Sequence, residues 1–115
     1  MISNIRQEDG VTVVALGERM DAATSPEARG RLHELISEGQ VRLVLNLRGV
    51  VFLDSSGLGL MVSCLRRCVA GGGDLCLSEV PEFAHAILQL TRLTRVFRIA
   101  ETDDEAVQAV QKSAQ

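Results

Sequence analysis

Apolar residues recur along this chain with two different periods, and the changes between the periods mark the expected elements. Two short β-prone runs, residues 2–7 and 11–16, flank Asp9-Gly10, and Asp-Gly between apolar runs predicts a tight antiparallel hairpin. The aliphatic run 41–47 is apolar at nearly every position, as expected of an inner strand covered on at least one face. Shorter strands are expected at residues 75–77 and 96–99.

Segments with helical spacing separate these strands. The first helix opens at Thr24–Glu27, where either Thr24 or Ser25 suits the N-cap, and its apolar stripe is Ala28, Leu32, Leu35 and Ile36. Further helices are expected at about residues 56–69, after Pro81, and after the capping box Thr102–Glu105. The order β-β-α-β-α-β-α-β-α predicts a single α/β domain over residues 1–115. Its mixed sheet should have four to five strands, with right-handed crossovers between parallel neighbours.

The apolar positions of the second helix define its expected phase. We assign Leu58, Met61, Val62, Leu65 and Val69 to its buried stripe. Leu60 and Cys64 fall off that stripe, beside Gly59 and Ser63. These positions are therefore expected to form a mildly apolar exposed strip.

Composition and charge narrow the classes of function. The chain has 115 residues, 46% of them hydrophobic, and a net charge of −3, which fits one domain with a largely aliphatic core. A nucleic-acid-binding surface needs clustered Lys and Arg, so nucleic acid is not expected as a partner. No apolar run approaches membrane-spanning length, and the N-terminus lacks the layout of a signal peptide. A membrane is therefore not expected as a partner. Because the number of cysteines is odd and a chain of this length needs no disulfide, we expect the protein in a reducing cytoplasm.

Candidate catalytic and metal-binding groups are sparse. Cys64 and Cys68 have i,i+4 spacing on one helix, and Cys76 lies on the next strand. A metal site would need a fourth ligand and tighter pairing, so the cysteines are better explained as small buried hydrophobes. The glycine run 71–73 follows a helix and lacks the Lys-Ser/Thr of a phosphate loop. No base is positioned for a serine nucleophile, and we expect neither an enzyme nor a bound cofactor or metal.

The turn Asp54-Ser55-Ser56-Gly57 is the most informative stretch. It leads from an apolar run into the second helix, where free backbone N–H groups and the helix dipole favour a capping side chain or a phosphate. A cap, worth about 1 kcal/mol, needs one polar side chain, and here there are three. Gly57 and Gly59 in the first turn each cost about 1 kcal/mol relative to alanine. We interpret the combination as a surface on which a partner chain reaches a serine.

Three blocks of residues resemble the STAS domain, the module of sulfate transporters and anti-sigma factor antagonists. They are Gly17–Asp21, Leu45–Leu47 and Phe52–Gly59, and the spacing between them also fits. The similarity runs from about residue 5 to residue 110. Within the family, the chain is similar more narrowly to the stand-alone bacterial anti-sigma factor antagonists. It implies a STAS fold with helices packed mainly on one face of the sheet. The family usually has a glycine where the third helix ends, whereas Arg92 stands near that point here, which leaves the geometry of this helix end open.

The resemblance also implies a function. The antagonist would bind an anti-sigma factor that is an ATP-binding serine kinase, and this binding would release the sigma factor. The kinase would phosphorylate Ser55, the serine directly after the motif aspartate, and a phosphatase of the protein phosphatase 2C class would reset it. Asp21 is expected near this serine. The alternative within the family is a STAS module that does not switch and serves a transporter, a lipid-transport complex or a phosphatase regulator.

The expected partner face surrounds Ser55. A phosphate adds about 1.5–2 negative charges at pH 7. A helix N-terminus tolerates this charge, whereas a protein interface near Asp54 and Asp21 would not. We therefore expect phosphorylation to act as a local electrostatic switch of binding. The exposed strip at Leu60 and Cys64 is expected to be covered by the partner, so that Leu60→Glu would abolish binding at nearly unchanged melting temperature. The full predicted face comprises Asp21, Asp54, Ser56, Gly57, Gly59, Leu60 and Cys64.

Overall fold

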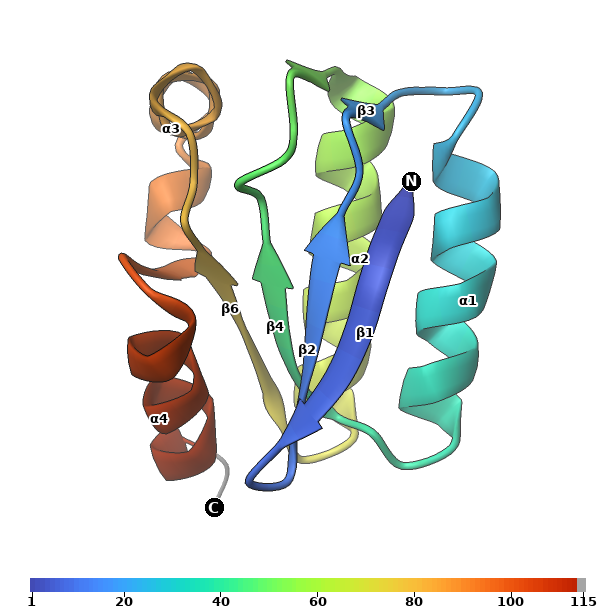
Figure 1. Ribbon diagram of the computed structural model, residues 1–115, viewed down its shortest axis with the longest axis vertical. Helices are drawn as coiled ribbons and strands as arrows, with labels where there is room; N and C mark the ends of the chain where they lie inside the picture. The colour runs from blue at the N-terminus through green and yellow to red at the C-terminus, as the bar shows by residue number, and fades with distance from the viewer. Residues whose placement is uncertain (114–115) are drawn as a thin grey trace.

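A mixed five-stranded sheet forms the centre of the protein (Figure 1). The computed structural model describes residues 1–113, and the sheet in it has the strand order β1-β2-β4-β6-β7. β1 (Ile2–Glu8) and β2 (Val11–Leu16) are antiparallel, whereas β4 (Arg42–Asn46), β6 (Asp74–Ser78) and β7 (Arg98–Ala100) run parallel to β2. The predicted fold class is confirmed.

The hairpin between β1 and β2 closes as its sequence predicts. Asp9 and Gly10 have φ angles of +51° and +80°, the positive values that a two-residue type I′ turn requires. Glu8 consequently pairs with Val11 across the turn.

Helices cover both faces of the sheet, three of them on the same side. α1 (Ser25–Ser37), α2 (Ser55–Ala70) and α3 (Glu82–Leu90) contribute to one core cluster, together with Leu43 and Leu45 of β4. α4 (Asp103–Ser113) packs on the other side, against a cluster that includes Val44. Successive residues of a strand point to opposite faces of the sheet. β4 is apolar at nearly every position because both of its faces are covered by helices. As expected, the helices pack mainly on one face of the sheet.

The predicted helix starts are largely confirmed. α1 begins at Ser25 with Thr24 as the N-cap residue and Pro26 in the first turn. The Thr24 hydroxyl does not bond the helix but donates to the carbonyl oxygen of Arg19 at 2.9 Å. At α4 the Glu105 amide donates to Thr102 Oγ1 at 3.2 Å, the first bond of the expected capping box. The Glu105 carboxylate reaches back to the Thr102 hydroxyl, which donates to Glu105 Oε1 at 3.2 Å.

Two features differ from the predicted element map. A short parallel pair, β3 (Arg19–Met20) with β5 (Phe52–Leu53), lies apart from the main sheet; such two-residue strands are too short to leave a period in the sequence. The last strand begins at Arg98 instead of residue 96, because residues 93–95 form a 3₁₀ turn. That turn follows Arg92, whose φ of +63° is left-handed, so an arginine adopts the conformation that glycine favours at a helix end.

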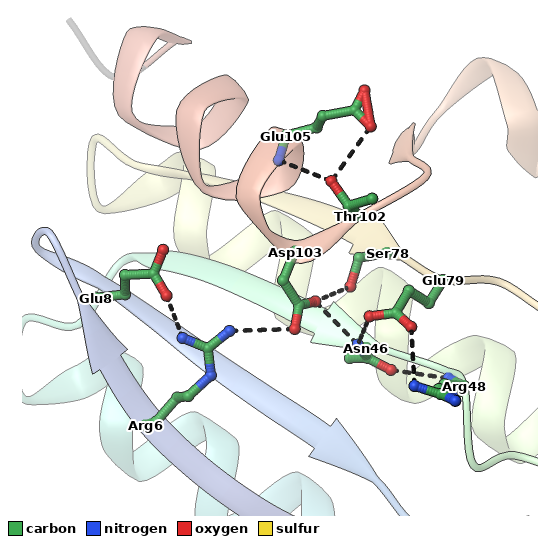
Figure 2. A network of polar contacts seen from close by, with 9 residues as sticks. All are labelled: Arg6, Glu8, Asn46, Arg48, Ser78, Glu79, Thr102, Asp103 and Glu105. Carbon is green, nitrogen blue, oxygen red and sulfur yellow. Dashed lines mark hydrogen bonds and ion pairs between the residues drawn. The ribbon is translucent and has the colours of Figure 1, made fainter.

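A polar network ties α4 to the carboxyl ends of the parallel strands (Figure 2). One carboxylate oxygen of Asp103 accepts hydrogen bonds from Ser78 Oγ at 2.6 Å and Asn46 Nδ2 at 2.9 Å, and the other pairs with Arg6 at 3.1 Å. Asn46 Nδ2 also donates to Glu79 at 2.8 Å. Burial alone would raise the pKa of Asp103, but these hydrogen bonds outweigh it and hold the pKa below its ordinary value.

Candidate partner-binding site

The β3–β5 pair holds the serine turn against the preceding loop. Arg19 pairs with Phe52 and Met20 with Leu53, so the two segments run in register. The Val51 and Asp54 amides extend the pairing, donating to the carbonyl oxygens of Glu18 at 2.8 Å and of Met20 at 3.1 Å. Figure 1 shows β3 beside the first turn of α2. Two of the motif blocks, residues 17–21 and 52–59, therefore form one structural unit.

Asp54, and not a serine, caps α2. Its Oδ1 accepts hydrogen bonds from the Ser56 amide at 2.8 Å and the Gly57 amide at 3.3 Å. Ser55 is the first helical residue and is exposed, and its hydroxyl has no hydrogen-bond partner among residues 1–113. The capping function and the free hydroxyl therefore belong to different residues.

Gly57 does not serve as an opening for a partner, contrary to the prediction. It is buried, and a Cβ built on it would lie 2.7 Å from Leu53 Cδ1, from Met20 Cβ and from the Met20 carbonyl oxygen. The bare backbone is thus needed for the approach of α2 to β3 and β5 within the molecule. Gly59 is exposed, so the expected access applies only to it.

Asp21 lies level with Asp54, because each follows a residue of the paired strands. Its carboxylate is already engaged: it pairs with Arg19 Nε at 2.9 Å and accepts from the Thr24 amide at 3.0 Å. The hydrogen bond from Arg19, followed by that from the Thr24 amide, lowers the pKa of Asp21 below its ordinary value. Asp21 therefore carries its negative charge at neutral pH and shares it with Arg19.

The expected docking strip at Leu60 and Cys64 is wrong. Both side chains are 0% exposed and belong to the main core. The actual buried stripe of α2 is Gly57, Leu60, Met61, Cys64 and Cys68, while Val69, assigned to the buried stripe, is 56% exposed. The reading of all three cysteines as buried hydrophobes is confirmed, and burial raises the pKa of the Cys64 thiol to about 11. α2 is thus rotated relative to the predicted phase.

Two exposed apolar residues precede the serine turn and lie outside the predicted partner face. Val51 is 67% exposed and Phe52 is 39% exposed. The guanidinium carbon of Arg19 stands 4.4 Å from the centre of the Phe52 ring, within the range of a cation–π contact. The signal available beforehand was their position in the sequence: Phe52 opens the motif block that leads to Ser55, and Val51 directly precedes that block.

A hollow of about 510 Å³ between α1 and α2 was also missed. Ser63 Oγ and His33 Nε2 connect the two helices at 2.9 Å. Burial, and then the positive charges of Arg67 and Arg29, lower the pKa of His33, so the imidazole is neutral at pH 7. The hollow is lined by Ala22, Ser25, Pro26, Arg29, Gly30, His33 and Ser56. Nothing in the helical period identifies it, because it depends on how two helices meet.

Across residues 1–113, no helix combines the length and the apolar character needed to cross a lipid bilayer.

Relatives of known type share both the sequence and the fold. The anti-sigma F factor antagonist of Paenibacillus polymyxa is 29% identical over 99 residues, covering 85% of each chain. The crystal structure of an anti-sigma factor antagonist from Mycobacterium paratuberculosis superposes with a TM-score of 0.85 at 25% identity, covering 96% of this chain and 95% of that one. The phosphorylated form of the Bacillus cell fate determinant SpoIIAA shares the fold, with a TM-score of 0.74, 22% identity and coverage of 96% and 99%.

A protein-family model described as the STAS domain matches residues 3–106. That range contains the Asp54–Gly57 turn and the whole sheet apart from Ile2, the first residue of β1. The chain belongs to the STAS domain family.

Proposed function

We propose that this protein is an anti-sigma factor antagonist controlled by phosphorylation of Ser55. In the unphosphorylated state it binds an anti-sigma factor that is also an ATP-binding serine kinase, and the sigma factor is released. The observation that carries the proposal is the separation of roles at the start of α2: Asp54 caps the helix through its carboxylate, while the exposed Ser55 hydroxyl is left unpaired among the described residues. The names of the relatives support the same function.

The modification is a phosphoryl transfer. The kinase moves the γ-phosphoryl group of its ATP to Ser55 Oγ, so that an O–P bond forms at the serine, the bond between the γ-phosphorus and the bridging oxygen breaks, and ADP and the hydroxyl proton leave. A phosphatase of the protein phosphatase 2C class hydrolyses the ester and returns the hydroxyl. The protein itself contributes a substrate serine and a binding face, and no catalytic group.

The partner face is assigned anew around Ser55. With Leu60 and Cys64 in the core, the exposed apolar contacts next to the serine are Val51 and Phe52, and Gly59 offers bare backbone on α2. Asp21 and Asp54 lie at the edge of this face, and Ser56 sits beside the serine. Burial of exposed apolar side chains supplies affinity at about 25 cal/mol per Å².

The cost of phosphorylation falls on the interface. A helix N-terminus accommodates a phosphate because its free N–H groups and dipole favour negative charge. A partner surface that fits a neutral hydroxyl would instead bury a dianion next to two carboxylates. A loss of about 3 kcal/mol would weaken binding more than a hundredfold, without a change of fold.

The test is a titration of the purified protein against the anti-sigma kinase of its own cell, with and without Mg-ATP. We expect wild type to lose at least a hundredfold in affinity once phosphorylated, Ser55→Ala to bind equally with and without ATP, and Ser56→Ala to behave as wild type. Phosphosite mapping should place the phosphate on Ser55 alone. If wild type and Ser55→Asp bind a partner equally and no phosphate appears, the chain is a STAS module that does not switch.

A further inference from the structure

Arg29 is an unpaired cation at the hollow between α1 and α2. Its side chain makes no hydrogen bond or ion pair within residues 1–113, whereas Arg31 on the same helix is paired with Glu34 at 3.2 Å. The Arg29 guanidinium reaches across to α2: its Nη2 atom lies 3.9 Å from the point where a Cβ on Gly59 would stand. A charge that pairs with nothing is therefore held over the exposed glycine.

Gly59 and Ser55 lie on one face of α2, because they are four residues apart. Neighbouring side-chain positions at this spacing are separated by about 5–6 Å, and each Cα–Cβ bond tilts toward the helix N-terminus. The Cβ of Ser55 thus lies no more than about 10 Å from Arg29 Nη2, and a phosphate on its Oγ can span part of that gap. Because residue 59 is glycine, no side chain at this position separates the two.

The lining of the hollow fits an oxyanion. Ser25 is 3% exposed, and its Oγ has no hydrogen-bond partner within the described residues, so a buried donor is available. Ser56 and Arg29 share the lining with Ser25, and none of the described residues contributes a carboxylate to it. The hollow therefore offers hydroxyl donors and a cation next to Ser56, the neighbour of Ser55 in the first turn of α2.

We infer that the phosphate on Ser55 turns toward α1 and is held by the Arg29 guanidinium at the mouth of this hollow. The inference rests on the proposed function, since it concerns the phosphorylated state. Charge-assisted bonds between guanidinium and phosphate are short and directional. The modified serine thus becomes a fixed part of the α1–α2 surface, and its charge is partly neutralised within the molecule. Asp54, the residue before the serine, and Asp21, level with it across the β3–β5 pair, oppose the ionisation of the phosphate.

The experiment uses the protein with phosphoserine incorporated genetically at position 55, so that no kinase is required. The second ionisation of the phosphate is followed by ³¹P NMR between pH 4 and pH 8. We expect Arg29→Gln to raise the phosphate pKa by about 0.5–1 unit relative to the parent. Arg29→Lys should restore part of the difference, and Arg31→Gln, the matched control on α1, should leave the pKa unchanged.

A second variant approaches the same contact from α2. Gly59→Leu places a side chain between the phosphate and the guanidinium, and should raise the phosphate pKa as Arg29→Gln does. If the phosphate has the same pKa in the parent, Arg29→Gln and Gly59→Leu, the proposed contact between the phosphate and Arg29 is refuted. That outcome is independent of the proposed function, which stands or falls on the titration with the kinase. Circular dichroism and the melting temperature of each variant verify that the fold is retained.

Discussion

The amide nitrogen of Asp54 donates a hydrogen bond to the carbonyl oxygen of Met20 at 3.1 Å. The same carbonyl oxygen lies 2.7 Å from the position that a Cβ on Gly57 would take. One peptide group of β3 therefore receives both the end of β5 and the first turn of α2. The placement of Ser55 depends on this contact, because Ser55 lies between the two residues that make it.

Gly57→Ala should destabilise the protein, whereas Gly59→Ala should stabilise it. The added methyl group at residue 57 would overlap Met20 and Leu53, and forced overpacking of this kind costs about 1–3 kcal/mol. At residue 59 the nearest atom is 3.9 Å away and belongs to the flexible end of Arg29. There the higher helix propensity of alanine contributes about 0.5–1 kcal/mol. Urea denaturation at pH 7 measures both free energies of unfolding.

The two variants control each other, because both replace a glycine in the same turn of α2 by the same residue. Equal effects on stability would mean that propensity alone decides, and that the contact between Gly57 and Met20 has no energetic role. Ser55 phosphorylation by the kinase should also slow in Gly57→Ala, since this substitution displaces the turn that carries the serine.

The phase of α1 was predictable and that of α2 was not, for a physical reason. α1 has charged residues opposite a single aliphatic stripe, and Ala28, Leu32, Leu35 and Ile36 are all buried as predicted. α2 is apolar on several sides, so large aliphatic residues such as Leu58 and Val62 gave a stripe as regular as the true one. The deciding constraint was close packing: Gly57 must face Met20, and that places Leu60 and Cys64 inward.

The candidate site was predictable in part. The location of Ser55 at the start of a helix followed from the order of an apolar run, an acid and two hydroxyls. The identity of the capping residue did not, because Asp54 and Ser55 are both good caps and only the backbone at Asp54 decides between them. The hollow beside Arg29 forms where α1 and α2 meet, and the sequence of either helix alone does not indicate how the two helices pack.

Val51→Glu should weaken partner binding without loss of stability. Val51 is 67% exposed next to the serine turn, so a carboxylate there is solvated in the free protein but buried against apolar atoms in the proposed complex. We expect at least a tenfold rise in Kd, and a change in melting temperature of no more than about 2 °C. The measurements are calorimetric titration with the kinase and thermal unfolding of the free protein.

Val69→Glu is the matched control for that substitution. Val69 is 56% exposed on the same helix that carries Ser55, and at 1.5 Å per residue it lies about 20 Å away from the serine. The Kd of Val69→Glu for the kinase should equal that of wild type. Wild-type affinity in Val51→Glu would place the partner face elsewhere, whereas parallel losses in both variants would indicate a general effect of added negative charge.

Asp103→Asn should destabilise the protein by about 2 kcal/mol at neutral pH, because hydrogen bonds to a charged group are worth about 1.5–3 kcal/mol. The pKa of Asp103 is held below its ordinary value of 3.8. Its contribution is therefore complete above that value and is lost as the pH falls through the lower folded-state pKa. The difference between wild type and variant should stay constant from pH 7 to about pH 5 and shrink below about pH 4.

Asp104→Asn provides the comparison for Asp103, since it changes the next residue in the same helical turn and Asp104 is exposed. It should alter the free energy of unfolding by no more than about 0.5 kcal/mol at any pH. Asp21 also has a lowered pKa, but it is present in every variant and cancels in the differences. A pH-independent effect of Asp103→Asn would mean that the network acts through shape and not through charge.

Arg92→Gly should stabilise the protein. Arg92 has a φ of +63° directly after the C-cap of α3, and the left-handed conformation costs a residue with a Cβ about 1–2 kcal/mol. Glycine removes that cost but loses more entropy on folding, by about 0.4–1 kcal/mol, which leaves a net gain of about 0.5–1 kcal/mol. Glu79 also has positive φ, +48°, yet Glu79→Gly would delete the contact with Asn46 at 2.8 Å and should give no gain. Urea denaturation of both variants separates backbone strain from side-chain contacts: a loss of stability in Arg92→Gly would mean that the arginine side chain contributes more than its backbone costs.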